Sequence, residues 1–495
     1  MAATRWRGAL VQTHRWLGIA GGLLFVAWFA SGIVMIYARM PAFEAGERLA
    51  RLPALDASAV RIAPADAARI AEANASAMRL GMLGGRPAYR FGAAAVFADT
   101  GEPVAALSPQ DALEVVREGW PEHGSTLAHE RRLTEPDQWT LQSRAFLPLH
   151  RLTLGDPDGT RLYVAERTGE VVMETTRSET LWAYPGAVLH WLYFTPLRAN
   201  SALWVQTIIW LSVAGCVLTL SGLVWGVWRY SPPQRRRAAG SASASPYTGL
   251  LRWHHYAGLV FGLFSFTWIL SGLLSMDPWG WHPGTAPTRE QREAVAGGPW
   301  RLDVVTADQM RGGAVALGAV GATREIGITQ FRGEPYFVAY HASSPPRLVS
   351  ALDPGSAPVE RFDDADLLEV AVGAIPGASI EQATRLDAYD AYYYDRSGAL
   401  PLPVLRVRYA DEVRTWLYLD PARGSIVRKE ERLTRLNRWL YHGMHSLDFP
   451  FLYTSRPLWD VLVIVLSLGG LVLSATTLLP GWRRLARVVR RSRAT

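Results

Sequence analysis

Hydrophobic residues are concentrated in four long stretches of the chain, and polar residues fill most of the rest. The apolar stretches lie at about residues 10–37, 203–228, 253–276 and 457–479. Each is longer than the roughly 20 residues that an α-helix needs to cross the hydrocarbon core of a bilayer. The pattern predicts four membrane-spanning helices. The first stretch is about twice as long as the apolar part of a secretion signal, so we expect it to be retained.

Arginines beside these stretches set the expected orientation. Thirteen of them precede the first stretch, separate the second from the third or follow the fourth, and these three segments contain no acidic residue: Arg5, Arg7, Arg229, Arg235, Arg236, Arg237, Arg252, Arg483, Arg484, Arg487, Arg490, Arg491 and Arg493. The positive-inside rule therefore places both termini in the cytoplasm. The thirteen charges exceed the net charge of +7, so the basic character reflects topology and gives little support to nucleic-acid binding.

The expected domain layout follows from these spans. The first half comprises a spanning helix with its cytoplasmic N-terminus (1–40), a periplasmic domain (41–180), and an interfacial helix with the second spanning helix (181–230). A cytoplasmic linker follows (231–250), with a flexible Gly/Ser stretch at 240–246. The second half comprises the third spanning helix (251–277), a second periplasmic domain (278–435), and an interfacial helix with the fourth spanning helix and a basic tail (436–495).

The chain resembles itself over long distances. Residues 13–32 (THRWLGIAGGLLFVAWFASG) align without a gap with residues 253–272 (WHHYAGLVFGLFSFTWILSG), at an offset of 240. Residues 160–172 align with 415–427 at an offset of 255, and the same offset pairs His190 with His445. We therefore expect two tandem halves of one design.

Each half also predicts a small extracytoplasmic α+β domain. Residues 160–172 and 415–427 read as two short strands around a turn that contains glycine. The first domain opens with a helical pattern (PADAARIAEANA) and a strand (RPAYRFG), and the second offers GEPYFVAY as a strand. The fold class is a bundle of four transmembrane helices in two repeats that carries two α+β domains.

These motifs resemble the PepSY-associated transmembrane helix family. The resemblance lies in a helix that starts HRWLG and ends SG, an external module with RPAYRF, and a histidine ahead of a returning helix. The family includes iron-regulated inner-membrane proteins and ferri-siderophore reductases. The resemblance implies a bacterial inner-membrane protein with periplasmic PepSY-like domains, b-type haem and a role in reducing ferric chelates.

Four histidines recur in the alignment. His14 corresponds to His254 near the cytoplasmic ends of two spans, and His190 corresponds to His445 on the periplasmic side. Two halves in the same orientation are related by a pseudo-twofold axis along the membrane normal, which brings equivalent residues face to face. We expect the two pairs to be axial ligands of two haems, and hence to bind the haem irons.

Glycines accompany the first pair. Gly18 and Gly22 share a helix face with His14, and Gly258 and Gly262 do so with His254. They leave room for a macrocycle, although Gly-x-x-x-Gly is also an ordinary helix-packing motif in membranes. A histidine at a helix end is also compatible with a simple interfacial position.

The remaining histidines and a tyrosine-rich segment are weaker candidates. His255 and His442 adjoin the pairs, His442 and His445 could together bind a metal ion, and His150 could be a ligand or a substrate contact. His123, His129, His282 and His341 are expected at the surface. Residues 387–395 (DAYDAYYYD) could meet an aromatic iron chelate or a partner protein, or form a strand with one buried face.

The functional hypothesis is electron transfer across the membrane by a membrane oxidoreductase similar to ferric-chelate reductases. The single cysteine, Cys216, excludes covalent c-type haem and iron–sulfur clusters. The cytoplasmic segments are too short for a flavin or nicotinamide domain, so quinol or a partner reductase must donate electrons to a periplasmic ferric chelate or redox protein. The alternative is a membrane-anchored PepSY module that binds or regulates a partner without redox chemistry. A transporter is disfavoured, because we expect the four spans to contain no aspartate, glutamate or lysine.

Overall fold

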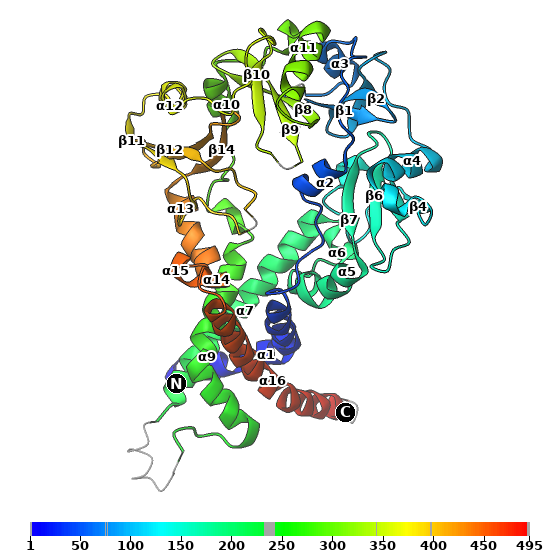
Figure 1. Ribbon diagram of the computed structural model, residues 1–495. Helices are drawn as coiled ribbons and strands as arrows, with labels where there is room; N and C mark the ends of the chain where they lie inside the picture. The colour runs from blue at the N-terminus through cyan, green and yellow to red at the C-terminus, as the bar shows by residue number, and fades with distance from the viewer. Residues whose placement is uncertain are drawn as a thin grey trace. The chain divides into compact units, whose positions relative to one another are not determined.

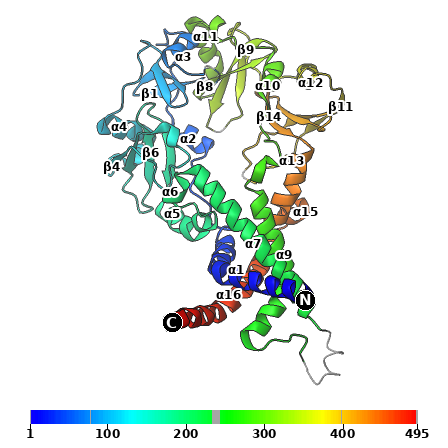
Figure 2. The same ribbon diagram turned by 180° about the vertical axis from the view of Figure 1, so that it is seen from behind.

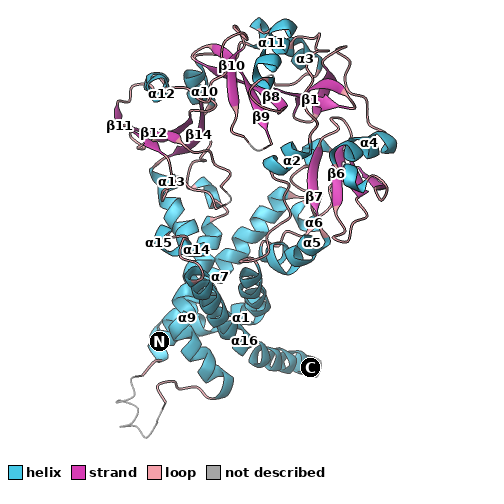
Figure 3. Ribbon diagram, in the orientation of Figure 1, coloured by secondary structure: helices cyan, strands magenta, loops and turns pink. Residues whose placement is uncertain are grey.

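The computed structural model describes residues 2–74, 76, 78–231, 243–342, 344–396 and 398–492 (Figure 1). The chain forms two compact units: unit 1 contains residues 1–40, 179–282 and 435–495, and unit 2 contains residues 41–178 and 283–434. The β-strands belong to unit 2, as the colouring of Figure 3 shows. Much of the expected cytoplasmic linker, residues 232–242, lies outside the described residues, and so do Arg235, Arg236, Arg237 and Arg493.

Unit 1 contains four helices that are long and apolar enough to cross a membrane. They are α1 (Ala2–Val34), α7 (Ser201–Arg229), α9 (Gly249–Leu274) and α16 (Leu458–Ser492), and the candidate spans within them are Arg5–Val34, Ser201–Arg229, Gly249–Leu274 and Leu458–Arg491. This finding agrees with the prediction of four spanning helices. Four such helices identify a multi-pass membrane protein. The expectation that the spans contain no acidic residue is wrong at Asp460, which lies in the first turn of α16 and pairs with Arg456.

The four helices pack in a ring. Helix α1 contacts α7 and α16, and α9 contacts the same two helices, so α1 and α9 face each other across the middle (Figures 1 and 2). Phe25, Phe29 and Trp268 are buried between them. A Cβ atom at Gly470 would lie 2.4 Å from the Phe29 ring, so glycine is required there for this ring to reach the bundle core.

Short helical segments lead into α7 and α16 and carry the second histidine pair, His190 and His445. The first set is α5 (Arg177–Ala183), the π-helical η4 (Tyr184–Val188) and α6 (Thr195–Arg198). The second is α13 (Arg432–Asn437), the π-helical η7 (Arg438–Gly443), α14 (Met444–Ser446) and α15 (Pro450–Tyr453). Trp204 and Trp459, 255 residues apart, each donate an indole N–H to a carbonyl oxygen of these segments, at 2.9 and 2.8 Å. These bonds fix the position of each segment against the following long helix.

Unit 2 is built around a six-stranded antiparallel sheet that contains strands from both halves of the chain. Its order is β10-β9-β8-β1-β2-β3. The strands are β1 (Met78–Leu83), β2 (Arg86–Phe91), β3 (Ala94–Phe97), β8 (Thr323–Phe331), β9 (Glu334–His341) and β10 (Arg347–Ser350). Strands β1 and β8 join the halves, with Leu80 opposite Ile326. Residues 41–180 and 278–435, which the sequence analysis predicts as two separate domains, therefore share one sheet.

Each half also contributes a four-stranded antiparallel sheet to unit 2. One is β4 (Ala128–Leu133), β5 (Leu149–Thr153), β6 (Arg161–Ala165) and β7 (Val171–Thr175); the other is β11 (Ile380–Leu386), β12 (Val404–Tyr409), β13 (Trp416–Asp420) and β14 (Ser425–Glu430). The strand pairs predicted around the two glycine turns, β6–β7 and β13–β14, are confirmed.

Helices cover these sheets and close their cores. They are α2 (Ala45–Arg51), α3 (Pro64–Ile70), α4 (Pro109–Gly119), α10 (Arg289–Ala296), α11 (Ala307–Gly318) and α12 (Asp364–Val372). Several begin at a capping box, in which the N-cap side chain accepts from the backbone N–H of residue N3 and the N3 side chain accepts from the backbone N–H of the N-cap. Ser108 with Asp111 and Thr306 with Gln309 are two examples. The sheets, with helices on them, agree with the α+β content expected from the sequence.

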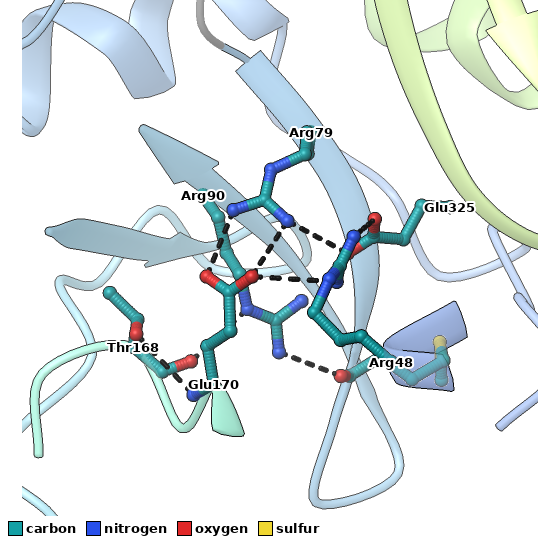
Figure 4. Close-up of polar contacts among 7 residues, drawn as sticks. Arg48, Arg79, Arg90, Thr168, Glu170 and Glu325 are labelled. Carbon is teal, nitrogen blue, oxygen red and sulfur yellow. Dashed lines mark hydrogen bonds and ion pairs between the residues drawn. The ribbon is translucent and has the colours of Figure 1, made fainter. Parts of the chain in front are cut away.

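An ionic network ties the two halves of unit 2 together (Figure 4). Arg48 pairs with Glu325 at 2.6 Å, and Arg79 pairs with Glu170 at 2.8 Å. Arg90, almost fully buried, donates to the carbonyl oxygens of Thr168 and Met82. Burial alone would raise the pKa of Glu325, but the hydrogen bond and charge of Arg48, with the charges of Arg79 and Arg90, lower it. Glu325 is therefore a buried carboxylate that the arginines keep ionised.

We expect Glu325→Gln to destabilise unit 2 by roughly 3–5 kcal/mol, because it removes one of the network's two carboxylates and leaves Glu170 to balance Arg48, Arg79 and the buried Arg90. The measurement is the urea dependence of proteolysis within unit 2 of the full-length protein. Asp366→Asn is the matched control, since it neutralises the exposed Arg332–Asp366 pair and should cost less than about 1 kcal/mol. Equal losses in the two variants would contradict the structural role of the network.

Candidate functional site

The first histidine pair lies inside the helix bundle. His14 comes from α1 and His254 from α9, and their ring centroids are 6.0 Å apart with 41° between the ring planes. The ring packing of the four helices accounts for this, because α1 and α9 face each other across it. The structure therefore brings together two residues that are 240 positions apart in the sequence.

Hydrogen bonds determine which nitrogen of each imidazole is available. Nδ1 of His14 lies 3.0 Å from the carbonyl oxygen of Leu218 in α7, and Nδ1 of His254 lies 3.0 Å from that of Leu473 in α16. A carbonyl oxygen can only accept, so Nδ1 carries the proton in each ring. In a neutral imidazole Nε2 then keeps its lone pair. A backbone carbonyl on the far nitrogen is the usual arrangement of a metal-binding histidine.

The second pair, His190 and His445, repeats this arrangement in the segments that precede α7 and α16. The ring centroids are again 6.0 Å apart, with 69° between the planes. Nδ1 of His190 lies 3.2 Å from the carbonyl oxygen of Trp28, and Nδ1 of His445 lies 3.2 Å from that of Trp268. Burial lowers the pKa of His190 to about 4 and also lowers the pKa of His445, so both rings are neutral at physiological pH.

A hydroxyl group accompanies every one of the four carbonyls. The residue three positions after the carbonyl is serine or threonine, and its hydroxyl donates to the same oxygen: Ser221 to Leu218, Thr476 to Leu473, Ser31 to Trp28 and Ser271 to Trp268. Ser31 and Ser271 also accept from the histidine Nδ1, both at 3.1 Å. Each histidine is thus held by a carbonyl with a hydroxyl beside it. No hydrogen bond to any of the four Nε2 atoms occurs among the described residues.

The spacing of both pairs fits a metal ion between two imidazoles. A metal lies about 2 Å from a coordinating imidazole nitrogen, and the ring centre lies about 1 Å behind that nitrogen, so two opposed rings have centres about 6 Å apart. Simple ring packing spans a wider range, about 4.5–7 Å. The described residues hold no group of three or more His, Cys, Asp and Glu side chains suited to a metal ion, so a bare ion would lack further protein ligands at either pair. A macrocycle that supplies the equatorial ligands needs only these two.

A cavity of about 420 Å³ adjoins the first pair. Its lining includes His14, His254 and four glycines of α1 and α9: Gly18, Gly22, Gly258 and Gly262. The volume lies in the range of small-molecule and cofactor pockets. A Cβ at Gly262 would lie 2.9 Å from the Leu223 side chain, so this glycine also allows close helix packing. The four glycines therefore line the cavity, and Gly262 also lets a neighbouring helix pack closely.

The weaker histidine candidates have other surroundings. His255 is buried with both ring nitrogens bonded, to the hydroxyl of Ser245 and the carbonyl of Gly226, each at 2.8 Å. His150 lies in unit 2 and is buried, with its nitrogens bonded to His129 and to the carbonyl of Leu107. His442 packs on Tyr441, with 4.3 Å between ring centroids.

Two expectations for residues outside the pairs need correction. His341 was expected at the surface but is buried at the end of β9, because the β8–β9 hairpin and Gly321 enclose its ring. His123, His129 and His282 are half-buried. The tyrosine-rich segment 387–395 is a loop and not a strand. Its Tyr393 is fully buried and stacks on Tyr418 at 4.7 Å, so this part of the segment belongs to the core.

In comparisons with known proteins, no family model, no curated protein and no solved structure matches the chain.

Gly222→Ala tests how tightly α7 fits against His14. A Cβ at position 222 would lie 2.5 Å from Cε1 of His14, so the ring or the helix must move, and we expect a loss of about 1–3 kcal/mol in stability. The measurement is thermal unfolding of the detergent-purified protein. Gly8→Ala in α1 is the control, because no atom lies near its Cβ position and alanine favours a helix there. Equal unfolding midpoints for the two variants would contradict the predicted clash.

Proposed function

We propose that this protein is a multi-pass protein of the bacterial inner membrane that binds two b-type haems and carries electrons to a periplasmic acceptor. The observation that carries the proposal is the repeated geometry of His14 with His254 and of His190 with His445. Both pairs have 6.0 Å between ring centroids and a carbonyl-bound Nδ1 on every ring.

The residues would act as follows. Each histidine pair would hold one haem through its two Nε2 atoms, and the glycine faces of α1 and α9 would lie against the first. Haem iron supplies one-electron chemistry by alternating between Fe(III) and Fe(II). With both axial positions taken by imidazole, the site favours electron transfer over oxygen binding. The carbonyl and hydroxyl partners would keep each ring in the ligating tautomer and orientation.

The tandem alignment and the arginine distribution support a route across the membrane. The histidine partners recur at equivalent positions, since Trp28 and Trp268 are 240 residues apart and Leu218 and Leu473 are 255 apart. A duplicated chain with a pseudo-twofold axis explains why one geometry occurs in both halves. By the positive-inside rule His14 and His254 lie toward the cytoplasm, and His190 and His445 toward the periplasm.

The proposed acceptor is a ferric chelate such as a siderophore, with a periplasmic redox protein as the other acceptor class. Hydroxamate and catecholate oxygens are hard ligands that hold Fe(III) better than Fe(II), so one added electron loosens the complex. The resemblance to the PepSY-associated transmembrane helix family supports this choice, and the sheets of unit 2 would correspond to its periplasmic domains. Quinol or a partner reductase would donate the electron, because the linker between the second and third spans, residues 231–250, is far shorter than the ~100 residues of a cofactor-binding domain.

We expect the purified protein to give a reduced-minus-oxidised spectrum of low-spin b-type haem with two haems per chain. His14→Ala should remove one haem and His190→Ala the other, because each deletes one axial ligand. The measurement is the haem-to-protein ratio together with the difference spectrum. His14→Met and His190→Met keep a side chain that can bind iron, so an altered but present spectrum separates ligand exchange from misfolding.

His123→Ala is the control for these variants, because His123 lies in unit 2 outside both pairs. A full complement of haem in both alanine variants would overturn the assignment of the ligands. Colourless protein after expression with ample haem would reject the electron-transfer proposal and favour the membrane-anchored binding module.

The proposed orientation is tested by thiol labelling in a Cys216→Ser background. Ala357→Cys places a thiol at an exposed position of unit 2, and Arg5→Cys places one at the exposed start of α1. We expect a membrane-impermeant maleimide added to intact spheroplasts to label position 357 and not position 5. Labelling of position 5 before lysis would contradict a cytoplasmic N-terminus.

A further inference from the structure

Three arginines converge on one part of the cavity beside His14 and His254. Arg15 comes from α1, and Arg484 and Arg487 come from the end of α16. None of the three forms an ion pair with a carboxylate of the described residues. Arg15 donates to Gln12, Arg487 donates to the carbonyl of Arg483, and Nε of Arg484 is buried without a hydrogen-bond partner in the described part of the chain. Guanidinium groups remain charged at any physiological pH, so this part of the cavity is strongly cationic.

The chain has no acidic residue nearby that could balance this charge. Residues 1–43, 201–276 and 461–495 contain neither aspartate nor glutamate, and these ranges include all four walls of the cavity. Like charges brought together without a counter-ion raise the free energy of the fold. The arrangement is therefore suited to an anion that comes from outside the chain.

The cavity indicates the form of that anion. Glycines and apolar side chains line it beside the histidine pair, and the arginines line it as well, so a suitable occupant has both an apolar body and negative charge. Arginine binds carboxylates through two parallel hydrogen bonds, which suits a pair of carboxylates on one edge of a molecule.

The cationic groups are confined to one side of the histidine pair. Helices α1 and α16 pack closely, since a Cβ at Gly481 would lie 3.5 Å from Ile19. The position 240 residues after Arg15 is His255, whose nitrogens are both bonded within the protein. The position 255 residues before Arg484 is Arg229, which is exposed and lies over the Trp225 ring. The two halves therefore match at the histidines, but the counterparts of Arg15 and Arg484 supply no free cation to the cavity.

We propose that Arg15 and Arg484, with Arg487 beside them, bind the two propionate carboxylates of the haem held by His14 and His254. This inference rests on the proposed function, and it adds an orientation: the propionate edge faces α1 and α16, and the apolar edge faces the glycines and the bundle core.

The test compares haem with its dimethyl ester, in which both carboxylates are blocked. A His190→Ala background leaves only the first site, and apoprotein from haem-deficient cells is titrated with either compound in a neutral detergent. We expect the parent to bind haem about tenfold or more tightly than the ester, because each charged pair contributes beyond a neutral hydrogen bond. Arg15→Gln with Arg484→Gln should lose most of this preference while the low-spin spectrum persists. Arg483→Gln, an exposed residue outside the cavity lining, should keep it.

The outcomes separate this inference from the function on which it rests. Equal affinity of the parent for haem and ester, or an equal effect of Arg483→Gln, overturns the propionate assignment while the haem proposal stands. Absence of a low-spin spectrum with either compound in the parent rejects the proposed function itself. Anionic phospholipid is the other source of an anion: if the double variant loses bound phosphatidylglycerol but keeps its preference for haem, the arginines bind lipid phosphate and the inference is wrong.

Discussion

One hydrogen bond, from Nδ1 of a histidine to a helix carbonyl oxygen, determines which nitrogen each paired imidazole of this helix bundle leaves available. It occurs four times, at His14, His190, His254 and His445, and each time it commits the proton to Nδ1 and leaves the lone pair on Nε2. The acceptor oxygens also receive a serine or threonine hydroxyl from three residues further along the helix. Each of these carbonyl oxygens therefore has two side-chain donors, one imidazole and one hydroxyl. Without these bonds the rings could rotate, and a ligand pair would lose its orientation.

These bonds depend on the packing of the whole bundle, because no histidine bonds to its own helix. His14 in α1 reaches a carbonyl of α7, and His254 in α9 reaches one of α16. His190 and His445, outside the long helices, reach back to α1 and α9. Each of the four long helices therefore supplies one acceptor. Small residues make the approach feasible, since side chains at Gly222 or Gly470 would collide with His14 or Phe29. The geometry of the pairs is a property of the assembled helices and not of local sequence.

This dependence explains what the sequence was able to predict. Apolar length identified the four spans, and the offsets of 240 and 255 identified which histidines are equivalent, because an internal alignment compares positions directly. The alignment does not reveal which backbone atoms lie opposite those histidines, because the packing of the helices sets their register. Ser31 and Ser271 were visible as a recurring pair, but their contact with histidine was not. The pairing of β1 with β8 and the burial of His341 were not predicted either, because both arise from contacts between segments far apart in the chain.

The differences between the halves matter as much as their likeness. Two identical sites would have the same electron affinity, and an electron would gain nothing by moving from one to the other. The two histidine pairs are alike in spacing, but their surroundings differ. Three arginines line the cavity beside the first pair. A hydroxyl lies 3.1 Å from each Nδ1 of the second pair, whereas in the first pair Thr476 lies 3.4 Å from Nδ1 of His254. Charge, hydrogen bonding and burial around a bis-histidine iron are the means by which a protein sets its reduction potential. Under the proposed function, two alike histidine pairs in different surroundings would give the two haems different reduction potentials, which is what directed electron transfer requires.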